Sequence, residues 1–217
     1  MKGSSGGEIQ AVIELDARYE DEVVALLVAA FEHDPGWLQV SGAPGEDHRR
    51  CLETVYRASW TLYRAARQPL LGVMAQDRLA GVAMLNVPGA KFAEPARRGW
   101  AQKVRRSVGD TILSRLLRNA REVARHRPEE PHLYLGTLAV RPDLQGSGIG
   151  RLLLESVSER SDRDPAARGV FLETENPKNV PLYEHFGYRI VGRYHYDQIK
   201  GTAMFHPCPV GSPGGPA

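Results

Sequence analysis

The sequence predicts an α/β protein: a mixed central sheet with helices on both of its faces. Apolar runs typical of strands alternate with amphipathic helical runs, in the order β-α-α-β-β-α-β-α-β-α-β-β. The 217 residues, with 42% hydrophobic and 25% charged side chains, are enough for one such domain with a sizeable core. We expect one domain over residues 8–206, between a flexible tail (1–7) and a disordered tail (207–217) rich in proline and glycine.

The elements of the first half are predicted from apolar periodicity and capping residues. The first elements are a strand over 8–15 and a helix that Asp16 caps; the run His-Asp-Pro-Gly-Trp ends this helix after residue 32. A second helix over about 47–67 follows, and then a hairpin over 70–87 that turns near Asp77. One or two helices cover about 96–126, with a break at Gly109.

The second half follows the same alternation with stronger signals. The predicted elements are a strand over 132–140, a glycine-rich turn, a helix from about residue 150, a strand over 169–175, a short helix over 179–187 closed by Gly187, and two final strands.

Composition excludes several classes of protein. The net charge of +2 is too small to indicate a nucleic-acid partner, and the longest apolar run, 23–31, has nine residues, whereas a membrane span needs about 20. Cys51 and Cys208 lie far apart, so they predict neither a disulfide framework nor a zinc site. We expect a cytoplasmic protein with no membrane contact and no metal centre.

Residues 145–150, Gln-Gly-Ser-Gly-Ile-Gly, join a predicted strand to a predicted helix. The first N–H groups of a helix are unpaired and its dipole is positive there, so such a turn can bind an anion through the backbone. A P-loop would need Lys-Ser or Lys-Thr next, and a dinucleotide-binding turn would need glycine in place of Arg151. A tight loop without a ligand remains the alternative.

Two motifs favour a ligand. The run from Val140 to Gly150 resembles motif A of the GCN5-related N-acetyltransferases, and the run from Asn176 to Tyr183, followed by Phe-Gly-Tyr, resembles motif B. Over about 126–192 the sequence is similar to the puromycin N-acetyltransferase-like bacterial enzymes of that family. The resemblance implies the family's fold, a sheet of about seven strands that splay apart between strands 4 and 5.

The resemblance also implies acetyl-CoA as the cofactor. The amides of the glycine turn would hold its pyrophosphate, while the Val140 N–H and the Leu138 C=O would pair with its pantetheine arm. Asn176 or Asn179 would fix that arm, unless they serve only as helix caps, and Arg151 would contact a phosphate or be solvated. The expected cofactor-binding residues are Leu138, Ala139, Val140, Gln145, Gly146, Ser147, Gly148, Ile149, Gly150, Arg151, Asn176, Asn179 and Tyr183.

Catalysis needs an acid for the leaving thiolate and a base for the amine. The resemblance assigns the acid to Tyr183, although a tyrosine here can also simply pack the helix on the sheet. Glu173 is the expected base, because a carboxylate in a desolvated cleft has a raised pKa; it could instead hold a substrate ammonium. His132 and His195 are alternative bases, and Glu175 is expected to be solvated.

We therefore expect an N-acetyltransferase that moves an acetyl group directly to a primary amine of a small molecule, such as an antibiotic or aminonucleoside. A protein or peptide N-acetyltransferase and a non-catalytic acyl-CoA-binding regulatory module remain alternatives.

Residues 97–127 contain ten basic and two acidic side chains. Such a segment is typical of a solvated helix face, or of a surface that attracts the 3′-phosphate of CoA or an acidic partner. Both monomer and homodimer remain open.

Overall fold

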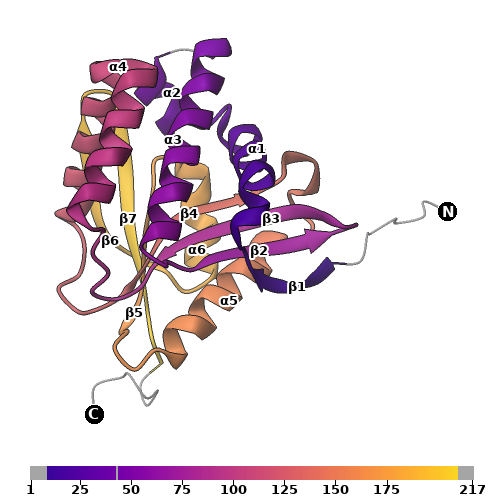
Figure 1. Cartoon of the computed structure of the whole chain (residues 1–217). Coiled ribbons are helices and arrows are strands. Elements are labelled where there is room, and N and C mark those ends of the chain that lie inside the picture. Colours follow the sequence, from indigo (N-terminus) through magenta and orange to yellow (C-terminus); the bar gives the residue numbers. More distant parts are fainter. Residues whose placement is uncertain (1–8, 43, 210–217) are drawn as a thin grey trace.

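A computed structural model describes residues 9–42 and 44–209, and it has a seven-stranded mixed sheet between two layers of helices (Figure 1). The strands are β1 (Ile9–Glu14), β2 (Leu70–Ala75), β3 (Arg78–Asn86), β4 (Leu133–Val140), β5 (Gly169–Thr174), β6 (Arg189–Tyr196) and β7 (Ile199–Pro207). The helices are α1 (Glu20–Phe31), α2 (Pro35–Ser41), α3 (Glu46–Ala65), α4 (Glu94–Ala124), α5 (Ile149–Arg163) and α6 (Val180–His185). The 3₁₀ turns Ala17–Tyr19, Pro142–Leu144 and Pro177–Asn179 precede α1, α5 and α6.

The sheet has the strand order β1-β2-β3-β4-β5-β7-β6, and its two halves meet at β4 and β5. These two strands are parallel and pair only at Leu133 with Val170 and at Tyr134 with Phe171; every other neighbouring pair is antiparallel. Beyond Tyr134 the two strands diverge. The predicted fold class and the predicted splay between strands 4 and 5 are both confirmed.

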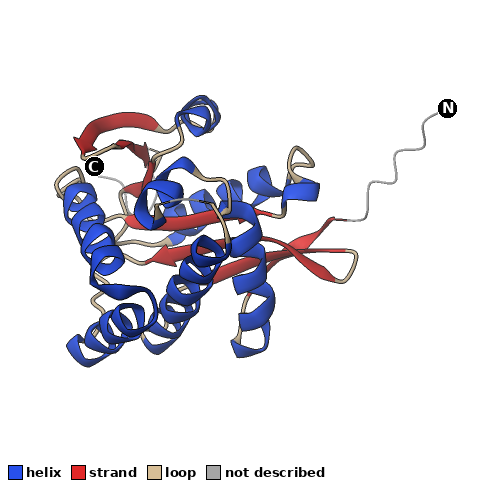
Figure 2. Cartoon of the chain, turned by 90° about the horizontal axis from the view of Figure 1, so that it is seen from above, coloured by secondary structure: helices blue, strands red, loops and turns tan. Residues whose placement is uncertain are grey.

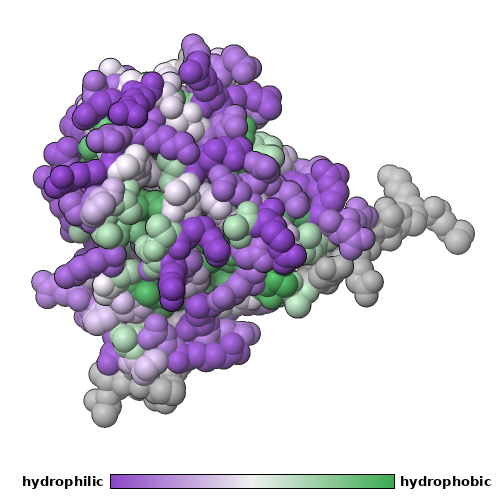
Figure 3. Space-filling view, viewed as in Figure 1, coloured by the Kyte–Doolittle hydropathy of each residue, from purple (hydrophilic) through white to green (hydrophobic). Residues whose placement is uncertain are grey.

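Each face of the sheet has its own apolar core, because helices cover both faces (Figure 2). On one face α5 buries Leu153 and Val157; on the other, α1 and α3 bury Leu27, Leu52 and Trp60. Each such side chain contributes about 1.5–3 kcal/mol through burial. The surface seen in Figure 3 is mainly hydrophilic, with small apolar patches.

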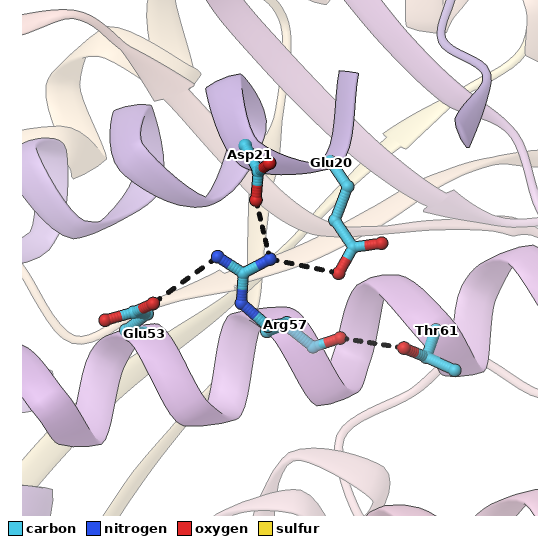
Figure 4. A network of polar contacts seen from close by, with 5 residues as sticks. All are labelled: Glu20, Asp21, Glu53, Arg57 and Thr61. Atoms are coloured by element: carbon cyan, nitrogen blue, oxygen red, sulfur yellow. Dashed lines mark hydrogen bonds and ion pairs between the residues drawn. The ribbon is translucent and has the colours of Figure 1, made fainter. Parts of the chain in front are cut away.

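A polar clamp also joins α1 to α3 (Figure 4). The Arg57 guanidinium lies 2.8 Å from Asp21, 3.2 Å from Glu20 and 3.4 Å from Glu53, and its side chain keeps 32% of its exposure. Solvent-exposed ion pairs contribute at most about 1 kcal/mol each. The clamp therefore fixes the relative position of the two helices more than it stabilises them.

Helix α2 was not predicted, because the run around Pro35 was interpreted only as a helix break. In the structure the Asp34 carboxylate caps a new helix, accepting hydrogen bonds from Gly36 N (3.0 Å) and Trp37 N (3.1 Å). An Asp at the N-cap followed by Pro at the first helical position is a recognised start signal. The sequence thus contained the signal for α2.

Two predicted helix features are confirmed. Gly109 has φ +88° and ψ 170° and kinks α4 at the predicted break. Gly187, with φ +83°, follows the end of α6, where its N–H donates to Glu184 O and the Tyr188 N–H donates to Tyr183 O. This Schellman motif needs a left-handed residue, which glycine adopts without steric cost.

The predicted N-terminal tail and most of the C-terminal tail lie outside the described residues. Strand β7 runs to Pro207, one residue past the predicted boundary, and the Cys208 N–H donates to Arg168 O at 2.9 Å. Within residues 9–42 and 44–209 no helix is both long and apolar enough to cross a bilayer.

Candidate active site

A cavity of about 360 Å³ opens where β4 and β5 part. The two diverging strands form its floor, and residues of α2, α3, α4 and α6 also line it. The cavity is possible because β4 and β5 form no backbone hydrogen bonds beyond Tyr134, where they diverge.

The glycine turn forms an exposed N-terminus for α5. Gly148 is the N-cap residue with φ +93°, and the first helical hydrogen bond runs from Leu152 N to Gly148 O at 3.0 Å. The N–H groups of residues 149–151 therefore have no partner within the helix. A Cβ built on Gly146 or Gly148 would meet no described atom within 4 Å, so the space in front of these amides is open to an anion.

The side chains of the turn point away from that space or make local contacts. Ile149 is buried in the core with 1% exposure, and the Ser147 hydroxyl donates to Leu144 O. Arg151 forms an ion pair with Glu155 at 2.8 Å and stays 64% exposed, as a solvated helix residue does. The turn therefore offers mainly its backbone, as expected from the sequence.

The backbone of β4 turns away from β3 at two of the three predicted positions, of which Leu138 lines the cavity. Arg141 N donates to Ala80 O at 2.9 Å, and Ala139 is aligned with Val82 of β3. Since N–H groups alternate sides along a strand, Ala139 pairs toward β3, whereas Leu138 and Val140 turn their backbone groups toward the splay. Only these two can bond a ligand arm by their backbone.

The two predicted asparagines have different surroundings. Asn176 caps the 3₁₀ turn before α6, its Oδ1 accepting the Lys178 N–H at 3.1 Å. Asn179 lines the cavity, where its Nδ2 donates to Thr174 Oγ1 at 3.3 Å. Asn179 is thus the one placed to reach a ligand in the cavity, and Asn176 acts as a cap.

Tyr183 projects from α6 into the cavity wall. It is 7% exposed and packs on Tyr188 with ring centroids 5.7 Å apart. No described residue forms a hydrogen bond with its hydroxyl, and burial together with the negative charge of Glu173 raises its pKa. The ring packs the helix on the sheet, while the O–H remains available as a donor.

Glu173 projects from β5 into the same cavity. Its Oε1 accepts the Tyr134 hydroxyl at 2.6 Å, while its Oε2 is buried without a partner in the described chain. Burial, helped by the charge of Glu175, raises the pKa of Glu173 to about 8. The Tyr134 hydrogen bond and the Arg127 guanidinium, 4.1 Å from the Tyr134 ring, oppose this rise.

The expectation that Glu175 is solvated is wrong. Its Oε1 accepts hydrogen bonds from the Tyr194 hydroxyl (2.7 Å) and from Asn119 Nδ2 (3.2 Å), and burial raises its pKa. Helix α2 covers it at Gly36, where an added Cβ would lie 2.9 Å from Glu175 Cβ. The unpredicted helix α2 is therefore the reason why this carboxylate is enclosed.

The two alternative bases do not line the cavity. His132 Nδ1 contacts Glu130 O at 2.7 Å, and its ring packs 5.6 Å from the Phe171 ring. Burial lowers its pKa. His195 is exposed on β6. Of the three predicted candidates for the base, Glu173, His132 and His195, Glu173 is thus the one that lines the cavity together with Tyr183.

Several cavity residues had no recognisable signal in the sequence. They are Asp34, Tyr56, Tyr63, Asn119 and Tyr134. The basic segment, by contrast, is largely the solvated face expected, with local ion pairs such as Arg98 with Glu94 (2.9 Å) and Arg105 with Asp110 (2.7 Å).

The site combines an open helix N-terminus with a free strand edge and a cavity. The chain belongs to the acetyltransferase (GNAT) family, whose model matches residues 37–188. It is accordingly an acetyltransferase of the class that uses acyl-CoA donors.

Solved structures share this fold over nearly their whole length. A histone acetyltransferase HPA2 and related acetyltransferase from Corynebacterium glutamicum is 21% identical, with a TM-score of 0.70, over 92% of this chain and 97% of that one. Arylalkylamine N-acetyltransferase 2 from Aedes aegypti is 13% identical (TM-score 0.67; 93% and 100% covered). An agmatine N-acetyltransferase is 18% identical (TM-score 0.56; 91% and 97% covered). At these identities the likeness establishes the fold alone.

Proposed function

We propose that the protein transfers an acetyl group from acetyl-CoA directly to a primary amine of a small molecule. One observation carries the proposal: a buried carboxylate with a free oxygen, Glu173, and a tyrosine with a free hydroxyl, Tyr183, line one cavity at the free edge of β4. A base and an acid on either side of one reaction site are what amine acylation requires.

The residues present fit acetyl-CoA as the donor. The N–H groups of residues 149–151 would hold the pyrophosphate at the positive end of α5. The Leu138 carbonyl and the Val140 amide would bond the pantetheine arm as an additional strand would, and Asn179 would reach the arm from the opposite wall. When bound, acetyl-CoA supplies an activated acyl group as a thioester.

Glu173 takes the proton from the acceptor amine. Its Oε2 has no partner in the described chain, and a pKa of about 8 suits a base near neutral pH. Tyr134 holds the other oxygen at 2.6 Å and so fixes the carboxylate plane. Tyr134 is therefore a positioning residue for the base.

Tyr183 returns a proton to the leaving thiolate. A phenol with the ordinary pKa of about 10 is protonated at neutral pH, and burial raises the pKa of Tyr183 further, so its O–H is present. A thiolate whose conjugate acid has a pKa of about 8.5 is basic enough to benefit from a nearby donor.

The lining of the cavity favours a small cationic amine. Carboxylates and aromatic rings form the part enclosed by α2, α3 and α4, and both types of group attract ammonium ions. Two proteins of the same fold act, by name, on an arylalkylamine and on agmatine, and a third is a histone acetyltransferase. The similarity over 126–192 to puromycin N-acetyltransferase-like enzymes supports including an aminonucleoside among the acceptors, although it covers mainly the cofactor half.

Release of CoA thiol from acetyl-CoA, measured over a panel of small amines that includes puromycin and a set of peptides, tests the proposal. Turnover of small amines above that of peptides is expected. The opposite order would favour a protein N-acetyltransferase. Calorimetric binding of CoA without any thiol release would favour a regulatory module and reject the enzyme.

A further inference from the structure

Three carboxylates line the cavity, and each is satisfied at one oxygen only. Asp34 Oδ1 accepts the N–H groups of Gly36 and Trp37, Glu175 Oε1 accepts its two donors, and Glu173 Oε1 accepts Tyr134. The structure shows no donor from the described residues for the second oxygen of any of the three, and the second oxygen of Glu173 is fully buried. Glu173 Oε2 is thus a buried acceptor atom without a partner in the described chain, and Asp34 and Glu175 line the same cavity.

No lysine, arginine or histidine is among the described residues that line this cavity. Burying a carboxylate without a cation in contact with it is unfavourable. The pKa values of Asp34, Glu173 and Glu175 are all raised by burial, and neighbouring carboxylates add to the rise at Glu173 and Glu175. A bound cation would offset this cost, and one cation near Glu173 would leave the other two carboxylates uncompensated.

Asp34 and Glu175 form a pair, separate from Glu173. The point where a Gly36 Cβ would lie is 2.9 Å from Glu175 Cβ and 3.2 Å from Asp34 Oδ1, so the two side chains are neighbours across α2. Glu173 lies in β5, whereas Glu175 follows the last residue of that strand, Thr174, at the bend before α6. Both side chains line the cavity.

Aromatic rings flank this pair. Tyr56 and Trp37 lie with ring centroids 5.2 Å apart, and the charges of Asp34 and Glu175 both raise the pKa of Tyr56. A cation between the two carboxylates would also gain attraction wherever it lies over the face of one of these rings.

We propose that the acceptor carries two cationic groups: a reacting amine at Glu173 and a second cationic nitrogen held between Asp34 and Glu175. This inference rests on the proposed acetyl transfer to a small amine, and it narrows the acceptor class to diamines and amines of similar charge. Short aliphatic diamines are the simplest acceptors that carry two such groups.

The inference is tested with diamines and monoamines of the same length. Thiol release is measured with 1,4-diaminobutane against butylamine and with 1,5-diaminopentane against pentylamine. We expect kcat/KM at least about tenfold higher for each diamine, the factor that corresponds to about 1.4 kcal/mol. Equal values within each pair, with clear turnover of both, would overturn the inference and leave the proposed acetyl transfer standing.

Two charge-neutral variants locate the second cation. Glu175→Gln, which can still accept the hydrogen bonds of Tyr194 and Asn119, should lower the diamine-to-monoamine ratio about tenfold. Asp34→Asn, which keeps a capping side chain on α2, should lower it as well and serves if Glu175→Gln fails to fold. The control is Glu184→Gln on the exposed face of α6, which should keep the ratio; a ratio that falls equally in the control would overturn the inference.

Calorimetric binding of 1,4-diaminobutane to the full chain gives a readout without turnover. Tighter binding than butylamine, lost in Glu175→Gln, would support the second cationic site even if no amine were acetylated, in which case only the proposed function would fail. Equal binding of both amines would overturn the inference independently of catalysis.

Discussion

The two sides of the cavity are built in opposite ways. On the cofactor side, the glycine turn and the end of β4 present backbone groups from a continuous stretch, residues 138–151, and their side chains are buried or turned outward. On the acceptor side, Asp34, Asn119, Glu173 and Glu175 present side-chain atoms from widely separated parts of the chain. In the proposed reaction, the first side would bind parts common to all CoA donors, and the second would bind the charge of the acceptor.

The difference implies different sensitivities to mutation. Binding through backbone N–H groups tolerates side-chain substitutions that keep the backbone conformation. Binding through side-chain atoms is altered when a single atom of the side chain is exchanged. Four predictions follow this contrast, from the largest expected effect to the smallest.

Glu173→Gln should lower kcat by about 10³-fold, within the range of about 10²–10⁴ typical of general acid–base catalysis. The amide oxygen can still accept the Tyr134 hydroxyl, so the fold and the cavity shape are preserved. Thiol release measures kcat, and calorimetry should give an unchanged affinity for CoA. A kcat within twofold of the original would remove Glu173 from the reaction.

Tyr183→Phe should lower kcat by about 10²-fold with little change in CoA affinity. The phenyl ring keeps the packing against Tyr188, so only the proton donor is lost. Steady-state kinetics and CoA binding are measured together. Unchanged turnover would reject the acid role and leave Tyr183 a packing residue.

Gly148→Val should weaken CoA binding about tenfold or more, because a β-branched residue is strained at φ +93° by about 1–2 kcal/mol and its side chain would enter the open space before the amides. Ser147→Ala, in the same turn, should change the affinity little. Calorimetry with CoA compares the two. Similar losses in both variants would mean that the turn is not the pyrophosphate site.

Arg127→Gln should shift the pH profile slightly. The active form of Glu173 is the carboxylate, so kcat/KM should rise with pH through a midpoint near its pKa of about 8. The Arg127 charge lowers that pKa, so its removal should move the midpoint upward, reducing activity at pH 7 but not well above pH 9. The shift should be small, because Arg127 is exposed and screened. A midpoint that moves to lower pH in Arg127→Gln would contradict this prediction.

The sequence alone predicted the strand, the glycine turn and the helix around Gly148, and the short helix that carries Tyr183, because these elements are contiguous in the chain. It predicted little of the cavity wall formed by distant segments. Asp34 and Glu175 meet because Gly36 of α2 packs on Glu175, just after the end of β5, a tertiary contact that no local pattern encodes. The same contact explains why Glu175 is enclosed and not solvated.

The splay of β4 from β5 has a consequence for association between molecules. A strand with unpaired backbone groups usually invites another polypeptide to add to the sheet, and proteins must guard against it. Here the edge at Leu138 adjoins a cavity that residues of α2, α3 and α4 also line, and both Leu138 and Val140 are partly buried. A narrow, flexible ligand arm can pair with such an edge, whereas a second polypeptide chain is too large to reach it. The gap between the strands can therefore bind a ligand without promoting aggregation through strand addition.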